Sequence, residues 1–259
     1  MELIFLGTGT SQGVPMIAQD APWLDLKDKR NWRTRTSVHL VMGGRHIQID
    51  AGPDFRAQCL ANDIRWLDHF FLTHPHADHM MGMDDLRRFC TLRGSSAMDV
   101  HLPRESVSRV AKAFGYAIRE VPENPYYPAF RLKPLAPKTE FDFGTVRYIP
   151  MPHGREVVAG LVFTERDTGI RVAYYTDCNV LTDEALAAAK GCDILVLDAL
   201  QPTKHPSHMT IQEACDAALR VSAGQTWLTH MNSWVNHADW DNRLPPSIAL
   251  AWDGLRVEP

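Results

Sequence analysis

The stretch that decides the fold is Thr73-His74-Pro75-His76-Ala77-Asp78-His79, which directly follows the apolar run Phe70-Phe71-Leu72. It holds three histidines and one carboxylate within six residues, a ligand set that suits zinc and related divalent ions. Side chains repeat every second residue in extended backbone, so His74 and His76 point the same way, with Cα atoms roughly 6.6 Å apart, and can hold one ion. Asp78 and His79 come where the backbone turns and can face a second ion, ~3.5–4 Å from the first. A histidine-rich surface loop is the simpler alternative, but it fits poorly after a buried strand.

The pattern His-x-His-x-Asp-His after an apolar strand resembles the signature of the metallo-β-lactamase superfamily. The resemblance implies an αββα sandwich, an α+β fold of two facing mixed β-sheets with outer helices and a metal site where the sheets meet. Pattern alone gives early strands, a helical middle and later strands that alternate with helices, which favours an α+β or α/β fold. No linker, repeat or low-complexity segment interrupts residues 1–259, so we expect a single hydrolase domain.

Composition limits the expected partners and location. Of the 259 residues, 45% are apolar and 22% are charged, which is ordinary for a globular protein. The formal net charge of −4 provides no basic field, which speaks against a nucleic-acid partner. Neither a signal-peptide pattern nor a run of about 18 apolar residues occurs, so we expect a cytoplasmic protein without a membrane partner. The five scattered cysteines are expected to be reduced thiols.

A two-ion site needs ligands from further along the chain, and three candidates each follow a predicted strand. His153 follows the strand predicted over residues 145–150, Asp177 that over 170–176, and His230 that over 226–229. One sheet edge can therefore present all of them beside the 74–79 cluster. The superfamily resemblance implies the pairing: His74, His76 and His153 on the first ion, Asp78, His79 and His230 on the second, and Asp177 bridging both.

Two divalent ions, zinc or manganese, would lower the pKa of a bridging water toward neutrality, so that hydroxide is available as the nucleophile. Protonation of the leaving group then needs a donor. His208 is the candidate general acid, and it lies in Pro206-Ser207-His208-Met209, just ahead of a helix that opens with a capping box at Thr210. The alternative is a histidine that only packs at the helix start. Asp78, as a metal ligand, and His208 are thus the candidate catalytic residues, and Asp50 is expected to orient a ligand histidine by hydrogen bonding.

Three segments look like the PhnP-like branch of the superfamily: Gly7-Thr8-Gly9-Thr10-Ser11-Gln12-Gly13-Val14-Pro15, Asp50-Ala51-Gly52 and the segment around His208. This resemblance implies hydrolysis of a small or cyclic phosphodiester, such as a ribose or nucleotide phosphodiester, and a homodimer by analogy. That branch also carries a structural zinc held by closely spaced cysteines after the first loop, whereas no cysteine precedes Cys59 here. The basic segment 18–35 stands in their place, is expected to be a solvated surface loop, and leaves the substrate open.

Other functions of the same fold stay open as alternatives. A tRNA 3′-processing endonuclease shares the ligands, but its long tRNA-binding arm is not evident in this sequence. Thioester, lactone or lactam hydrolysis uses the same ions, and only the pocket would distinguish these reactions. A flavodiiron-type oxygen-reducing site usually has glutamate where His76 stands, which favours hydrolysis. A non-catalytic metal-binding accessory protein in cofactor biosynthesis is the alternative from another class, and His208 discriminates because such a protein needs no proton donor.

Overall fold

The first β-sheet gathers the apolar strands of the N-terminal half and adds the last strand of the chain at its edge. The computed structural model describes residues 1–259, and β2 and β3 are joined through Gly43 and Gly44, both at positive φ, as a tight hairpin requires. Strands β14, β1, β2 and β3 are neighbours that pair antiparallel. Strands β3, β4, β5 and β6 are neighbours that pair parallel. The strand order is β14 (Arg256–Val257), β1 (Glu2–Gly7), β2 (Ser37–Met42), β3 (Arg45–Ile49), β4 (His69–Phe71), β5 (Met98–Leu102) and β6 (Phe130–Pro134).

The second β-sheet comes from the C-terminal half and also mixes both kinds of pairing. Strands β13 to β10 pair parallel, and β10 to β7 pair antiparallel. The strand order is β13 (Ile248–Leu250), β12 (Gln225–Thr229), β11 (Ile194–Asp198), β10 (Arg171–Tyr175), β9 (Glu156–Glu165), β8 (Gly144–His153) and β7 (Lys138–Glu140).

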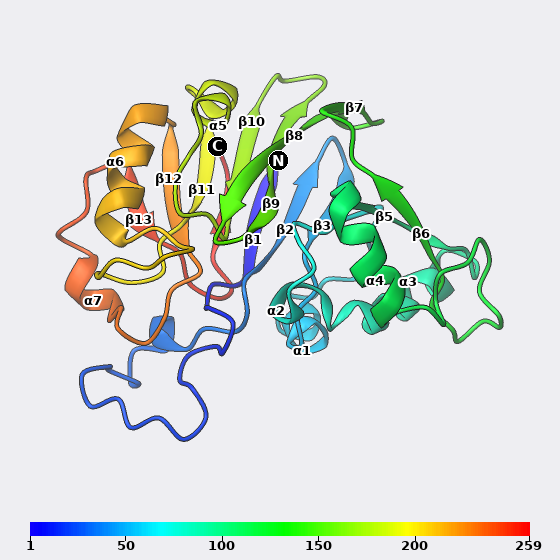
Figure 1. Cartoon of the computed structure of the whole chain (residues 1–259), viewed down its shortest axis with the longest axis horizontal. Coiled ribbons are helices and arrows are strands. Elements are labelled where there is room, and N and C mark those ends of the chain that lie inside the picture. Colours follow the sequence, from blue (N-terminus) through cyan, green and yellow to red (C-terminus); the bar gives the residue numbers. More distant parts are fainter.

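Helices cover the outer faces of the two sheets (Figure 1). Helices α1, α3 and α4 share an apolar cluster with the outer face of the first sheet, and α5 and α6 share one with the second. The α-helices are α1 (Phe55–Ala61), α2 (Ala77–Met80), α3 (Arg87–Leu92), α4 (Val107–Ala113), α5 (Asp183–Ala189), α6 (Ile211–Val221) and α7 (His237–Trp240). Three short 3₁₀ helices complete the set: η1 (Lys29–Asn31), η2 (Met83–Leu86) and η3 (Arg104–Ser106). None of the helices combines the length and apolar character that a membrane-spanning segment needs.

Alternation of buried side chains along the strands builds the layers. In β11, Ile194 and Val196 pack between the two sheets, whereas Leu195 and Leu197 pack against the layer of α5 and α6. Apolar residues on both faces are what a central parallel strand between two layers requires. The predicted αββα sandwich, an α+β fold with two facing mixed sheets, is therefore confirmed.

The end of β8 lies three residues beyond the sequence prediction, whereas β10 and β12 match their predicted ranges to within one residue at each end. His153 was expected beyond a strand ending at Pro150, but it is the last residue of β8. The strand is longer because β8 and β9 stay paired up to the turn, where His153 lies opposite Glu156. His153 is therefore held by the sheet itself rather than by a loop.

Candidate metal centre

Seven ligand-type side chains meet where the segments after β4, β10 and β12 approach the end of β8. The ligand atoms of His74, His76 and His153 lie within 4.8 Å of one another, and those of Asp78, His79, Asp177 and His230 do the same. Asp177 reaches both groups, because its carboxylate lies 3.3 Å from Nε2 of His79 and of His230. The same carboxylate lies 3.8 Å from His74 Nε2. All seven residues that the sequence singled out are thus close together, in two groups that share one carboxylate.

Three residues of this centre have a left-handed backbone conformation, with positive φ. Asp50, Asp177 and His230 have φ values of 62°, 55° and 63°, and they lie just beyond β3, β10 and β12. A non-glycine residue in this conformation costs of order 1–3 kcal/mol and persists only where its surroundings over-determine it. The strain is concentrated at the turns that aim these side chains into the centre.

Asp50 fixes the orientation of His79. Both residues are fully buried, and Asp50 Oδ2 lies 2.8 Å from His79 Nδ1. Asp50 also accepts hydrogen bonds from the backbone N–H and the hydroxyl of Thr73, each at 2.8 Å. Because an ionised carboxylate can only accept, His79 carries its proton on Nδ1 and turns Nε2 toward the centre.

Three carboxylates act on His79 in the protein without metal. Burial opposes a charge on its ring, but Asp177, Asp78 and Asp50 outweigh burial and hold the pKa of His79 well above its usual value. The bare site thus favours a positive charge beside its carboxylates. A bound cation would supply that charge and displace protons from the ligands.

The centre leaves buried nitrogen atoms without hydrogen-bond partners. These atoms are Nε2 of His79 and both ring nitrogens of His230. Buried polar atoms in native proteins are normally paired, so each exception needs an explanation. Imidazole nitrogens and carboxylate oxygens converging on the same space are the donor set of zinc and manganese sites. The residues therefore fit divalent metal ions.

His208 and Asp198 form a buried pair beside the seven side chains. His208 Nδ1 lies 2.8 Å from Asp198 Oδ2, and its ring stacks on that of His230 at a centroid distance of 4.7 Å. Asp198 is fully buried and also accepts a hydrogen bond from the backbone N–H of Cys178. Burial opposes protonation of His208, but Asp198 outweighs it and raises the pKa of His208 to about 9.

Sequence reasoning missed Asp198, although a signal was present. It is the last residue of the buried strand β11, as the ligand candidates stand at the ends of neighbouring strands. Sequence reasoning also missed Glu156. Its Oε2 lies 3.3 Å from His76 Nε2, and its carboxylate pairs with both terminal nitrogens of Arg109. No sequence signal distinguishes Glu156, because its role depends on the β8–β9 pairing that brings it beside the centre.

Gly52 lets the turn after β3 pack directly against the loop that carries Asp78. A Cβ atom at this position would lie 2.0 Å from the Asp78 carbonyl oxygen, which real structures do not allow. The neighbouring N–H of Ala51 donates to the His79 carbonyl at 2.7 Å. This close approach of the two backbones therefore positions Asp78 and His79, two of the seven ligand candidates.

We expect Gly52→Ala to lower the free energy of unfolding by about 1–3 kcal/mol, because the new methyl group forces the two backbones apart. The same shift should reduce the metal content after reconstitution. Denaturant titration and metal analysis check both effects, with Ala57→Ser at an exposed position of α1 as the control. Wild-type stability and metal content in Gly52→Ala would contradict this account.

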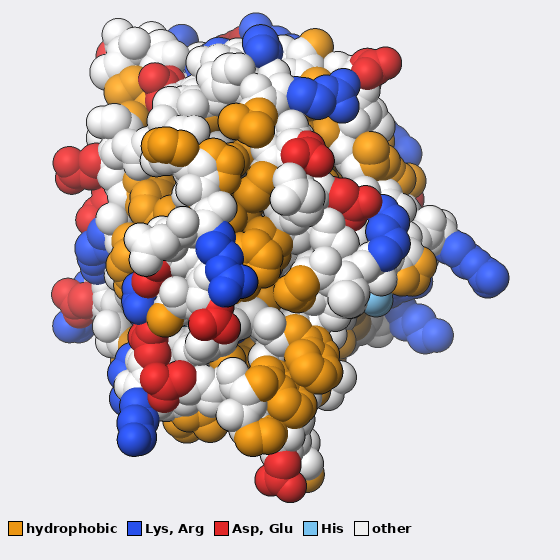
Figure 2. All heavy atoms as spheres, turned by 90° about the vertical axis from the view of Figure 1, so that its left-hand side faces the viewer, with side chains coloured by type: hydrophobic (Ala, Val, Ile, Leu, Met, Phe, Trp, Pro, Cys, Tyr) orange, Lys and Arg blue, Asp and Glu red, His pale blue; other side chains and the backbone are white.

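The basic segment 18–35 is not simply a solvated loop, which corrects the expectation from its composition. Arg33 is only 2% exposed, and its guanidinium donates to the carbonyls of Val235 at 2.8 Å and Asn232 at 3.2 Å. Trp23 stacks on Trp234 with ring centroids 4.3 Å apart. Figure 2 shows the side of the molecule that is at the left in Figure 1. Apolar side chains gather at its lower end, where Figure 1 places the segment. The segment thus clamps the chain that directly follows His230.

We expect Arg33→Met to lower the free energy of unfolding by about 2–4 kcal/mol, because two carbonyl groups lose their buried donor. Metal retention should fall as well, since the chain after His230 is released. Thermal or denaturant unfolding with metal analysis checks this, with Arg30→Met as the control. Arg30 is partly exposed and pairs with Asp28, so its loss should change stability by less than about 1 kcal/mol.

Comparison with known families and structures identifies what the chain resembles. The family model described as the Beta-lactamase superfamily domain matches residues 45–231. A crystal structure described as a new diphosphatase from the PhnP family is 30% identical with a TM-score of 0.88, over 99% of this chain and 96% of that one. Zn(2+)-bound PqqB from Methylobacterium extorquens is 18% identical with a TM-score of 0.77, over 100% of both chains, and shares the fold.

Two curated relatives carry names of different activities. An octanoyltransferase of Porphyromonas gingivalis is 33% identical over 264 residues, which cover 99% of this chain and 51% of that protein. The chain thus spans about half the length of that relative. A ribonuclease Z of Archaeoglobus fulgidus is 24% identical, over 87% of this chain and 86% of that protein.

Proposed function

Because the chain belongs to the metallo-β-lactamase superfamily of hydrolases, and within it to the PhnP-like branch, we propose that it is a two-metal phosphodiesterase acting on a small or cyclic phosphodiester. The substrate class includes ribose and nucleotide phosphodiesters. One observation carries the proposal: a carboxylate, Asp177, lies between two groups of ligand atoms, with a hydrogen-bonded histidine, His208, beside them.

The two metal ions, zinc or manganese, would be held by the two groups described above. His74, His76 and His153 would hold the first, Asp78, His79 and His230 the second, and Asp177 both. When bound, such ions make a water molecule acidic enough to ionise near neutral pH and offset negative charge on phosphate oxygens. Asp50 supports this arrangement by holding the Nδ1 proton of His79, so that its Nε2 faces inward.

His208 is the proposed proton donor to the leaving oxygen. Asp198 accepts from its Nδ1, which leaves Nε2 as the nitrogen that can serve a substrate. A ring nitrogen of His208 lies within 4.8 Å of ligand atoms of His153 and Asp177, so a phosphodiester held at the centre would lie within reach. The hydrolysis then breaks one P–O bond, adds the elements of water, and leaves a phosphomonoester and a free hydroxyl, which stay in one molecule when the diester is cyclic.

The decisive experiment is hydrolysis of bis(p-nitrophenyl) phosphate by protein reconstituted with zinc or manganese, beside a thioester and a β-lactam. The metal content of the same sample is measured. We expect turnover of the phosphodiester alone, with about two metals per chain. Turnover of the thioester or the lactam instead, or a fully loaded protein without turnover of any of the three, would overturn the proposal.

A ribonuclease function is the second candidate, because the relatives include several proteins named ribonuclease Z. Their names weaken the expectation, based on a net charge of −4, that nucleic acid is excluded as a substrate. A precursor tRNA in the same substrate panel separates the two candidates. Cleavage of the tRNA with little turnover of small cyclic phosphodiesters would favour the ribonuclease. The octanoyltransferase of Porphyromonas gingivalis supports no transferase activity for this chain, which matches only 51% of that protein.

A further inference from the structure

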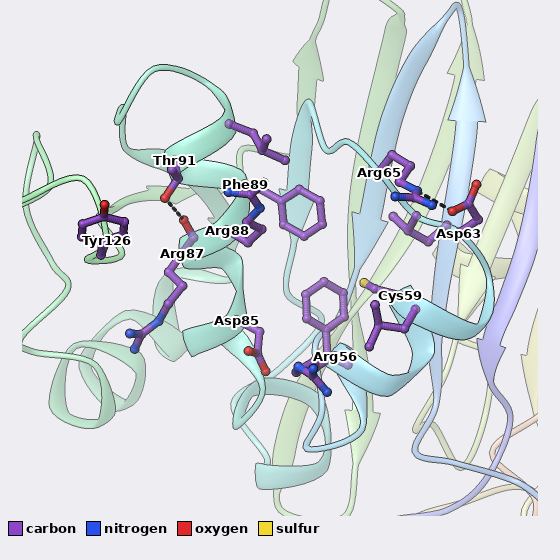
Figure 3. Close-up of a pocket in the computed structure, with 14 residues that line it drawn as sticks. Arg56, Cys59, Asp63, Arg65, Asp85, Arg87, Arg88, Phe89, Thr91 and Tyr126 are labelled. Atoms are coloured by element: carbon purple, nitrogen blue, oxygen red, sulfur yellow. Dashed lines mark hydrogen bonds and ion pairs between the residues drawn. The ribbon is translucent and has the colours of Figure 1, made fainter.

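A cavity lies away from the metal centre, on the outer side of the first sheet. It has a volume of about 720 Å³, which is in the range of small-molecule sites. Its walls are α1, the turn after it, η2 and α3, and Tyr126 stands at its edge (Figure 3). None of the seven ligand candidates, nor His208 or Asp198, lines it. It is therefore a separate site rather than an extension of the first.

The floor and walls of this cavity are apolar. Phe55 and Phe89 are buried and lie against each other with ring centroids 6.3 Å apart. Leu60 and Leu92 are 67% and 42% exposed, although they line the same hollow. Figure 3 shows the Phe89 ring and the Cys59 thiol facing the space between α1 and α3. Burial raises the pKa of the Cys59 thiol to about 12, so this wall stays uncharged and unreactive.

The rim of the cavity carries arginines, and two of them have no partner. Arg65 pairs with Asp63, and Arg87 pairs with Asp84. Arg56 and Arg88 line the cavity, are exposed, and make neither a hydrogen bond nor an ion pair through their side chains. Asp85 is the one acidic lining group outside these pairs, so the free rim charges are two positive and one negative.

We propose that this cavity binds a small carboxylate with an apolar tail, the tail lying over the wall that includes Leu60 and Leu92 and the carboxylate lying at the rim that carries Arg56 and Arg88. Apolar walls favour an apolar body in proportion to the area removed from water. A guanidinium matches a carboxylate with two parallel hydrogen bonds, which fixes the head group. A cavity of about 720 Å³ bounded by separate segments suits a small ligand more than a folded partner.

Decanoate is the probe, titrated by calorimetry into the metal-reconstituted full chain below the concentration at which it forms micelles. Three compounds isolate its parts: decanol lacks the charge, decyltrimethylammonium reverses it, and acetate lacks the tail. We expect one decanoate per chain, bound at least about tenfold more tightly than decanol, since a charge-assisted hydrogen bond contributes more than tenfold. Acetate and the cation should not bind measurably.

Substitutions of residues that line the cavity test whether decanoate binds there. Because Arg56 and Arg88 are exposed, the double variant Arg56→Gln with Arg88→Gln should fold normally and bind decanoate about tenfold less tightly, with decanol unaffected. Leu60→Asp should abolish decanoate binding by placing a carboxylate in the wall. Arg104→Gln, at an exposed arginine outside the cavity without an ion pair, is the matched control. Phosphodiester hydrolysis should be unchanged in all of them.

Two results would overturn the proposal: decanoate binding no tighter than decanol, or wild-type affinity in the double arginine variant. Because the readout is binding and not turnover, either result is independent of the phosphodiesterase proposal.

Discussion

Replacing Asp177 by alanine is expected to abolish hydrolysis and to lower the metal content of the chain. Asp177 is buried, and its carboxylate lies 3.3 Å from His79 and His230 and 3.8 Å from His74. It is the carboxylate that reaches both ligand groups, so its loss leaves Asp78 as the one carboxylate among the candidate ligands and none close to His74. Losing several kcal/mol of charge stabilisation corresponds to a rate lower by about 10³-fold or more.

The test combines turnover of bis(p-nitrophenyl) phosphate with metal analysis of the same protein. Asp177→Asn keeps the shape of the side chain and removes only its charge, so it should show the same losses if charge is the cause. Asp167→Asn, at an exposed carboxylate in the turn between β9 and β10, is the control and should behave as wild type. An active Asp177→Ala protein that retains two metals would refute the role given to this residue.

Replacing His208 by alanine is expected to leave the metal content unchanged and to slow hydrolysis in a way that depends on the leaving group. A diester that releases an alkoxide needs a proton, and general-acid catalysis contributes about 10²–10⁴-fold. A p-nitrophenolate group leaves without one, so its loss in rate should be within about tenfold. The ratio of the two losses therefore measures proton donation and not a general disturbance of the site.

Two neighbouring variants sharpen this result. Asp198→Asn removes the charge that holds the His208 Nδ1 proton, so it should shift the same ratio in the same direction by a smaller amount. His205→Ala, whose ring centroid lies 5.2 Å from that of His208, is the control and should leave the ratio unchanged. Equal losses on the two substrates in His208→Ala would remove His208 from the role of general acid.

The positions of the candidate ligands were predictable because they follow one structural rule. Polar residues just beyond apolar strands collect at the edge where those strands end, and Asp177 and His230 obey this rule after β10 and β12. His153 departs from it only because β8 continues to the turn. Asp198 is likewise the last residue of its strand, β11, and it was missed because a lone aspartate at a strand end has no spacing pattern that separates it from an ordinary turn residue.

Other features could not be read from the chain at all. The burial of Arg33 depends on the carbonyls of Asn232 and Val235, which lie about two hundred positions away in the sequence. The apolar cavity lined by Phe55 and Phe89 exists because α1 and α3 leave a space between them on the outer face of the first sheet. Local periodicity describes which face of an element is apolar, but not how closely two elements approach.

Strand and helix periodicity in the sequence predicted an α+β or α/β fold, and the resemblance carried by the 74–79 motif implied the two facing mixed sheets and the candidate ligands, because periodicity and ligand chemistry are local properties. Only the tertiary structure decided the rest: the partner of His208, the clamp after His230, the closeness of Asp177 to both ligand groups, and the separate cavity. These depend on distances between side chains far apart in the chain, which are set by how the sheets and helices pack and not by the residues that any one of them contains.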